Sequence, residues 1–234
     1  MSIVINKTTV PSPAAMWEAL TYFMENGDRT TGHTLNEYVV SSFTTFIKGF
    51  LVALVVAFPL GLLLGYSNIL REFASPAIDV LRPIAPVAWA PVFVVLWGYS
   101  LGPLMVVFVG IFFPLLTSVT FGVRKIDPLW YDAAKTLGAS QLQIFQKIVI
   151  PASIPFLMNG VKIGLGIGWM CIVSAELYAS PVGGLGAFIV DQAAANYWPG
   201  VYVGIFLVGI LGILTVGVAD YLHKTLSKRM GMDA

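Results

Sequence analysis

Two charged side chains, Lys162 and Glu176, lie in a stretch of apolar residues where charge is costly. No other Asp, Glu, Lys or Arg occurs between Pro151 and Tyr178, and a charge at the centre of a membrane span costs about 3 kcal/mol. On one helix the two residues would be about 21 Å apart by rise and within about 40° of each other. Both are therefore candidates for a functional site, and because they share a face they could line one pathway through the membrane. The alternatives are that Lys162 snorkels toward the cytoplasm or pairs with a neighbouring helix, and that Glu176 anchors an outer loop.

A second informative stretch is the polar segment 124–151, which predicts two short helices joined by a glycine elbow. Asp127 followed by Pro128 is a helix start, and Gly138 is a natural left-handed helix stop. Ser140 can cap a second helix that runs to about Ile150.

Segment 124–151 also carries large apolar side chains that should not face water together. They are Trp130, Tyr131, Leu137 and Phe145. A protein partner that covers them is one explanation, and the small Ala133 and Ala134 would let its surface approach closely. The alternative is an amphipathic loop that lies on the lipid headgroups.

The composition identifies the bilayer as the main solvent of this chain. Of 234 residues, 57% are hydrophobic and 11% are charged, and the mean hydropathy is +0.84, which excludes an ordinary soluble domain. Thirteen Lys and Arg against twelve Asp and Glu leave no basic surface for nucleic acid. The single cysteine, Cys171, can form neither an internal disulfide nor a thiol metal site, so we expect no metal.

Runs of uncharged residues predict an all-α transmembrane bundle of about five spans. The spans are expected within 49–70, as two antiparallel helices in 83–123 with a turn at 98–103, within 151–178 and within 192–219. Residues 1–40 are expected to be an N-terminal extracytoplasmic segment with an amphipathic helix opened by Ser12 and Pro13. The N-terminus shows no signal-peptide pattern, so the apolar segments should direct insertion.

The positive-inside rule orients these spans. One side has only Lys7 and Arg29, whereas the other collects Arg71, Arg82, Arg124, Lys125, Lys135, Lys147, Lys224, Lys228 and Arg229. We therefore expect the N-terminus outside a cell membrane, with segment 124–151 and the tail, residues 226–234, in the cytoplasm.

Residues 124–151, which we call the coupling loop, contain a stretch that resembles the signature of ABC importer permeases, which reads Glu-Ala-Ala, three residues, Gly, nine residues, Ile, one residue, Leu, Pro. Asp132 stands in place of the Glu, and Ile150 in place of the Leu. The other signature positions match, namely Ala133, Ala134, Gly138, Ile148 and Pro151. The resemblance implies a type I importer permease domain over 41–225, with a coupling helix that docks on an ATPase subunit.

The same resemblance implies the rest of the assembly: two ATPase chains, a second permease copy and an extracytoplasmic solute-binding protein. This chain should bind no cofactor, because it has no GxxxxGK[ST] phosphate loop, and ATP and Mg²⁺ would be bound by the ATPase. We therefore expect that the chain is not an enzyme.

Looser similarity points to the nitrate, sulfonate, taurine and bicarbonate branch of these permeases. It rests on PSPAAMWEAL from Pro11, LRPIAPVAWAPVFVVLWG from Leu81, GVKIGLGIGWMCIVSAE from Gly160, and GLG at Gly184. Members of that branch usually have a further N-terminal span, which we do not find here. The branch implies a small, anionic solute, without identifying which one.

Two other classes of protein compete with this interpretation. A self-contained secondary transporter or channel would have similar composition, but it should show inverted repeats, which we do not find. An intramembrane enzyme is disfavoured because His33 and His223 are expected outside opposite membrane faces.

Overall fold

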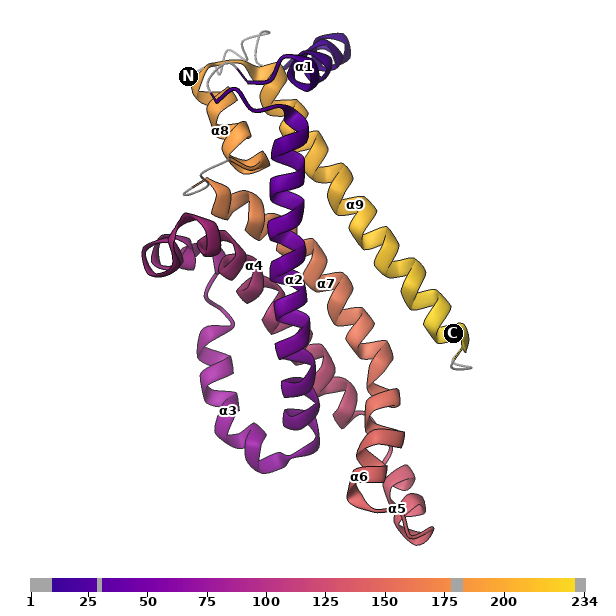
Figure 1. Cartoon of the computed structure of the whole chain (residues 1–234). Helices are drawn as coiled ribbons and strands as arrows, with labels where there is room; N and C mark the ends of the chain where they lie inside the picture. The colour runs from indigo at the N-terminus through magenta and orange to yellow at the C-terminus, as the bar shows by residue number, and fades with distance from the viewer. Residues whose placement is uncertain (1–9, 29–30, 178–182, 230–234) are drawn as a thin grey trace, which may run out of the picture. The chain divides into compact units, whose positions relative to one another are not determined.

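The computed structural model of the chain describes residues 10–28, 31–177 and 183–229 (Figure 1). Every regular element in these ranges is a helix, which confirms the all-α prediction. The chain divides into two compact units: the first holds the residues up to Gly49, Pro86–Val107 and Trp169–Leu214, and the second holds the remainder. Lys7, Arg29 and residues 230–234 of the expected cytoplasmic tail lie outside the described residues.

Among the described residues, four helices are long and apolar enough to cross a membrane, against the approximate five expected. They are α2 (Leu35–Tyr66), α4 (Ala90–Arg124), α7 (Ile150–Glu176) and α9 (Trp198–Arg229). Shorter elements join them: α1 (Pro13–Glu25), α3 (Asn68–Leu81), η1 (Pro86–Trp89), α5 (Pro128–Thr136), α6 (Gln141–Ile144), η2 (Phe145–Val149) and α8 (Leu185–Ala194).

Residues 83–123 differ from the expected pair of full antiparallel spans. Helix α4 breaks at Gly98, whose φ of +74° and ψ of −179° lie inside the predicted turn. The reversal is sharp, because a Cβ on Gly102 would lie only 3.0 Å from Cα of Val94. The piece before the break, Ala90–Trp97, is far shorter than the roughly 20 residues of a spanning helix. The turn is therefore where the sequence places it, but only the piece after it is long enough to cross.

The first and last spans also begin and end elsewhere than expected. Helix α2 already starts at Leu35, inside the expected segment 1–40, so that Lys48 lies within the helix. It ends at Tyr66, because Ser67 opens α3 and its hydroxyl accepts the backbone N–H of Leu70 at 3.4 Å. The last span starts at Trp198 rather than near residue 192, since the residues before it form α8.

Close glycine contacts define how the long helices pair inside each unit. In the first unit, a Cβ on Gly49 of α2 would lie 2.8 Å from the side chain of Val107 of α4. In the second unit, Gly61 approaches Val119 in the same way, and Gly65 approaches Val123. The contacts advance together along both helices, so α2 and α4 are parallel.

Helix α7 contacts both α4 and α9. A Cβ on Gly160 would lie 2.9 Å from Ser118, whereas Gly164, one turn further along α7, faces Ile111, earlier in α4. Lys162 pairs with Asp220 of α9 in the second unit. Directions along the chain are therefore the same for α2 and α4, and opposite for α7.

Helix α1 and helix α8 belong to the core of the first unit. Ser12 caps α1 and Pro13 begins it, as predicted. The rings of Phe23 and Phe188 meet edge to face with centroids 5.1 Å apart. The buried residues of this core are Ala19, Phe23, Leu35, Tyr38, Leu185, Phe188 and Val203. One face of α1 is therefore covered by protein.

Candidate functional site

The coupling loop folds locally as its sequence predicts. Asp127 caps α5 by accepting the backbone N–H of Leu129 at 2.9 Å, and Pro128 is the first helical residue. The helix stops at Gly138, which has the left-handed φ of +77°. The N–H of Ala139 then returns to the carbonyl of Ala134 at 3.0 Å. This closes the last turn of α5 in the manner typical of glycine stops.

The second helix of the loop differs from the prediction, because it does not end near Ile150. Ser140 and Gln143 form a reciprocal capping box at its start, with bonds of 3.3 Å and 2.8 Å. The helix then widens into the π-helical turn Phe145–Val149 and continues directly as α7. The wide turn precedes Pro151, which has no N–H for a regular helical bond. The loop is thus rigidly continuous with a membrane span.

The large apolar side chains of the loop fall into two groups. Tyr131 and Phe145 pack on the buried cluster that includes Val119 and Val149 of the second unit. Burial raises the pKa of the Tyr131 hydroxyl, and nearby Tyr66 adds to this effect. Trp130 and Leu137 form the exposed group, at 57% and 88%. Of the two, Leu137 has less cover from the described part of this chain.

Helix α5 carries three of the signature positions, Asp132, Ala133 and Ala134, and a fourth, Gly138, lies just after its end. Asp132 and Lys135 are one turn apart and their charged groups lie 3.9 Å from each other, both well exposed. No residue of α5 is buried. Ala133 and Gly138 are exposed as well, and Ala134 is partly covered. The arrangement presents a short, capped helix to the surroundings.

The C-terminal end of α2 holds the loop in place. The Tyr66 hydroxyl donates to Oε1 of Gln141 at 2.5 Å, and its ring meets that of Phe145 edge to face at 5.5 Å. Sequence reasoning missed this contact, because Tyr66 and Gln141 are 75 residues apart.

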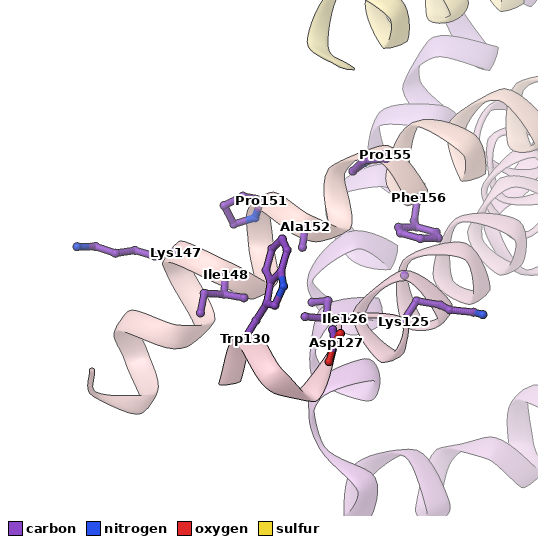
Figure 2. Close-up of a pocket in the computed structure, with 11 residues that line it drawn as sticks. Lys125, Ile126, Asp127, Trp130, Lys147, Ile148, Pro151, Ala152, Pro155 and Phe156 are labelled. Carbon is purple, nitrogen blue, oxygen red and sulfur yellow. The ribbon is translucent and has the colours of Figure 1, made fainter. Parts of the chain in front are cut away.

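A pocket of about 780 Å³ lies behind α5, at the junction of α4, α5 and α7 (Figure 2). Two of the three remaining signature residues, Ile148 and Pro151, line it together with Trp130, whereas the third, Ile150, packs against the buried cluster of the second unit. Figure 2 shows the Trp130 indole lying against this apolar wall, whereas the Lys125 and Lys147 side chains point away from each other. Apart from Ile150, the signature therefore divides into an exposed part on α5 and a part that faces the pocket.

Lys162 and Glu176 lie in different units, and each has partners of its own. The Lys162 ammonium pairs with Oδ1 of Asp220 on α9, and both side chains are partly exposed. Sequence reasoning missed Asp220, although it is the charge that ends the uncharged run before it. This ion pair joins α7 to α9, and it corresponds to the alternative in which Lys162 pairs with a neighbouring helix.

Glu176 is buried, 4% exposed, and is held by uncharged donors. Its carboxylate accepts the Ser42 hydroxyl at 2.7 Å and the backbone N–H of Gly186 at 2.9 Å. Ser42 in turn accepts the N–H of Leu185 at 2.8 Å. Helix α8 starts at Gly184 without a cap of its own, so Ser42 and Glu176 serve as its caps from α2 and α7. Ser42 was not anticipated from the sequence.

A metal site is not apparent in the ranges that the structure describes. They contain no group of three or more His, Cys, Asp or Glu side chains able to hold an ion. Cys171 is buried and its thiol is free.

Comparison with known proteins supports the resemblance noted above. Residues 49–230 match the family described as binding-protein-dependent transport system inner membrane component. A putative ABC transporter permease protein of Methanocaldococcus jannaschii is 32% identical over 90% of this chain and 86% of its own length. The bicarbonate transport system permease protein CmpB of Synechococcus elongatus is 28% identical over 95% of this chain and 82% of its own. The nitrate import permease protein NrtB of Synechocystis sp. is 30% identical over 88% of this chain and 76% of its own length.

The fold is also similar to a solved structure, described as an inward facing conformation of the MetNI methionine ABC transporter. The two chains superpose with a TM-score of 0.67 at 21% identity, over 92% of this chain and 99% of the other. With the family match over most of the sequence, this establishes that the chain belongs to the binding-protein-dependent transport system inner membrane components and is a permease subunit of an ABC importer.

Proposed function

We propose that a separate ATPase subunit drives this permease by docking on α5. The observation that carries the proposal is the exposure of a well-capped helix: Leu137 is 88% exposed, no residue of α5 is buried, and both ends of the helix are fixed. Apolar side chains presented in this way are typical of a protein interface. The sequence has no phosphate loop, so ATP and Mg²⁺ are expected to bind to the partner.

The connections of α5 suggest how a push on it would reach the membrane. On one side, Lys125 and Ile126 alone separate α4 from the Asp127 cap. On the other side, α6, η2 and α7 follow one another without a break. Tyr66 adds a third connection, to α2. A displacement of α5 would therefore move the ends of three long helices together.

We further propose that the transported solute is a small anion of the nitrate, bicarbonate or sulfonate kind. The support is similarity to a bicarbonate and a nitrate permease. Lys162 stays the candidate that meets this solute, because its ammonium is partly exposed and Asp220 offsets the cost of its charge in the membrane. Glu176 has all its close donors inside the first unit, which favours an anchoring role over a pathway role.

The remaining partners and the orientation complete the proposal. We expect a second permease copy, surrounding lipid and an extracytoplasmic binding protein, with the N-terminus outside and the C-terminus in the cytoplasm. The distribution of Lys and Arg supports this orientation.

Co-purification tests the docking proposal. A tagged chain is expressed with the ATPase encoded beside it, in native form and as the Leu137→Asp variant. The native chain should co-purify with the ATPase. The amount of ATPase recovered with the variant should be at least ten times smaller. Trp17→Asp is the matched control, since Trp17 is 66% exposed on α1, and it should retain the ATPase. A native chain that purifies alone and still transports solute would favour a secondary transporter.

A further inference from the structure

Helices α2 and α4 are consecutive long spans, yet they run in the same direction. The parallel pairing rests on two contacts inside the second unit, Gly61 with Val119 and, one turn further along both helices, Gly65 with Val123. Two spans that cross a membrane in the same direction need a return crossing between them. The chain from Ser67 to Gly98 must therefore pass back through the bilayer.

Neither helix in this connection is long enough to make the return alone. Helix α3 has 14 residues, about 21 Å by rise, against a hydrocarbon core of about 30 Å. Ala90–Trp97, before the reversal at Gly98, is shorter still. The return crossing is therefore broken, and α3 forms its first half. Figure 1 shows α3 turning back from the end of α2 after Ser67.

Helix α3 is sharply divided into a polar and an apolar side. On a helical projection its polar residues share an arc of about 100°, and they are Arg71, Glu72, Ser75, Asp79 and the C-cap Arg82. The opposite arc includes Ile69, Phe73 and Val80, which are 81%, 88% and 69% exposed. At membrane depth the apolar arc suits lipid, whereas each charge facing lipid would cost about 3 kcal/mol.

The polar backbone groups at the end of α3 would also be costly if they faced lipid. Residues 82–85 follow α3 without regular helix and are exposed. Irregular backbone at membrane depth occurs where it is covered by protein or lines a water-filled cavity, and not where it faces lipid. Arg82 lies at this point, deeper in the membrane than the cytoplasmic position expected from charge counting.

We infer that the polar stripe of α3, defined by Arg71, Glu72, Ser75, Asp79 and Arg82, lines the water-filled route of the solute, with Arg82 at its deep end. The inference rests on the proposed function, because it assigns a lining to the pathway of that permease. A guanidinium at the deep end suits a small oxyanion, which it can bind through two parallel N–H donors.

Two paired measurements on the assembled importer test this inference, both in a Cys171→Ala background. In the first, a fluorophore is attached in the Ile69→Cys and Val80→Cys variants, which share the apolar arc, and its depth is measured by quenching with nitroxide lipids. A crossing helix places the two labels about 16 Å apart in depth. A helix lying on the membrane surface gives equal depths and would overturn the inference.

In the second measurement, a membrane-impermeant charged thiol reagent is applied to the Ser75→Cys and Ala77→Cys variants. The two positions lie within about 3 Å in depth but on opposite arcs. We expect the Ser75→Cys variant to react at least ten times faster. Equal rates, or an unreactive Ser75→Cys variant, would mean that protein or lipid covers the stripe and would contradict the inference.

Neither measurement needs ATP, so both can be read separately from the docking proposal. If the ATPase fails to co-purify while the depth difference and the Ser75 reactivity are found, docking on α5 is wrong and the pathway lining stands. If the ATPase co-purifies and the two depths are equal, docking on α5 stands and the pathway lining is wrong.

Discussion

Helices α1 and α5 begin with the same local signals and have different surroundings. Each is a short helix outside the long spans, each has a polar cap residue, and each starts with a proline. Helix α1 buries Ala19 and Phe23 in the core of the first unit. Helix α5 buries none of its residues and leaves Trp130 and Leu137 exposed. A polar cap followed by proline thus fixes where each helix starts, but it does not determine what covers the helix's apolar side.

The comparison predicts that the two helices respond differently to mutation, and Phe23→Ala should have the largest effect. Phe23 is 4% exposed and packs on Phe188, so its truncation should lower the free energy of unfolding by about 3–5 kcal/mol. Thermal unfolding of the detergent-purified chain measures this loss. An unchanged melting temperature would show that α1 does not contribute to the core.

Ser42→Ala should destabilise the surface on which α1 packs. The Ser42 hydroxyl donates to Glu176 and accepts from the N–H of Leu185. Its removal leaves a buried carboxylate and a buried N–H short of partners, at a cost of about 1–3 kcal/mol. Limited proteolysis near α8, compared between native chain and variant, reports the loss. Ser41→Ala is the neighbouring control, and equal cleavage of both variants would contradict the trans-capping role.

Asp127→Ala should have a smaller effect, confined to the start of α5. The variant loses the side-chain bond to the N–H of Leu129, which is worth about 1 kcal/mol. Hydrogen exchange of the first-turn amides of α5 should rise about fivefold, whereas α1 should be unaffected. The Asp127→Asn variant keeps a capping oxygen and should restore protection. If Asp127→Asn exchanges as fast as Asp127→Ala, the cap is not what fixes the helix start.

Leu137→Asp should have almost no effect on stability. The side chain is 88% exposed, and substitutions at such positions usually change the free energy of unfolding by less than about 0.5 kcal/mol. Its melting temperature in detergent should therefore equal that of the native chain. A large drop would mean that Leu137 is covered within this chain, and the contrast with α1 would disappear.

Local features of the fold could be predicted from the sequence where a few neighbouring residues decide them. The caps at Ser12 and Asp127, the stop at Gly138 and the turn near Gly98 are of this kind. Span ends were less well predicted, because α2 extends through Lys48 and an apolar run does not show where a helix of mixed polarity begins. The continuation of the second loop helix into α7 was missed. The π-helical turn Phe145–Val149 comes just before Pro151 and lets the helix continue through this proline.

The candidate site could be predicted only in part, because some of its contacts join distant segments. The signature positions lie together on the loop, but nothing near Lys162 or Glu176 in the sequence points to Asp220 or Ser42. The polar stripe of α3 is visible in the sequence, yet its meaning depends on the parallel pairing of α2 with α4. Direction and pairing are properties of the assembled helices.

Photocrosslinking from α5 tests the central claim, docking of an ATPase, most directly. In a Cys171→Ala background, a benzophenone maleimide is attached in the Ala133→Cys variant, and in the Ala14→Cys variant of α1 as the control; both positions are exposed. The account predicts that the Ala133 label captures the ATPase subunit and that the Ala14 label does not. Capture of lipid alone from Ala133, in a preparation that still transports solute, would contradict it.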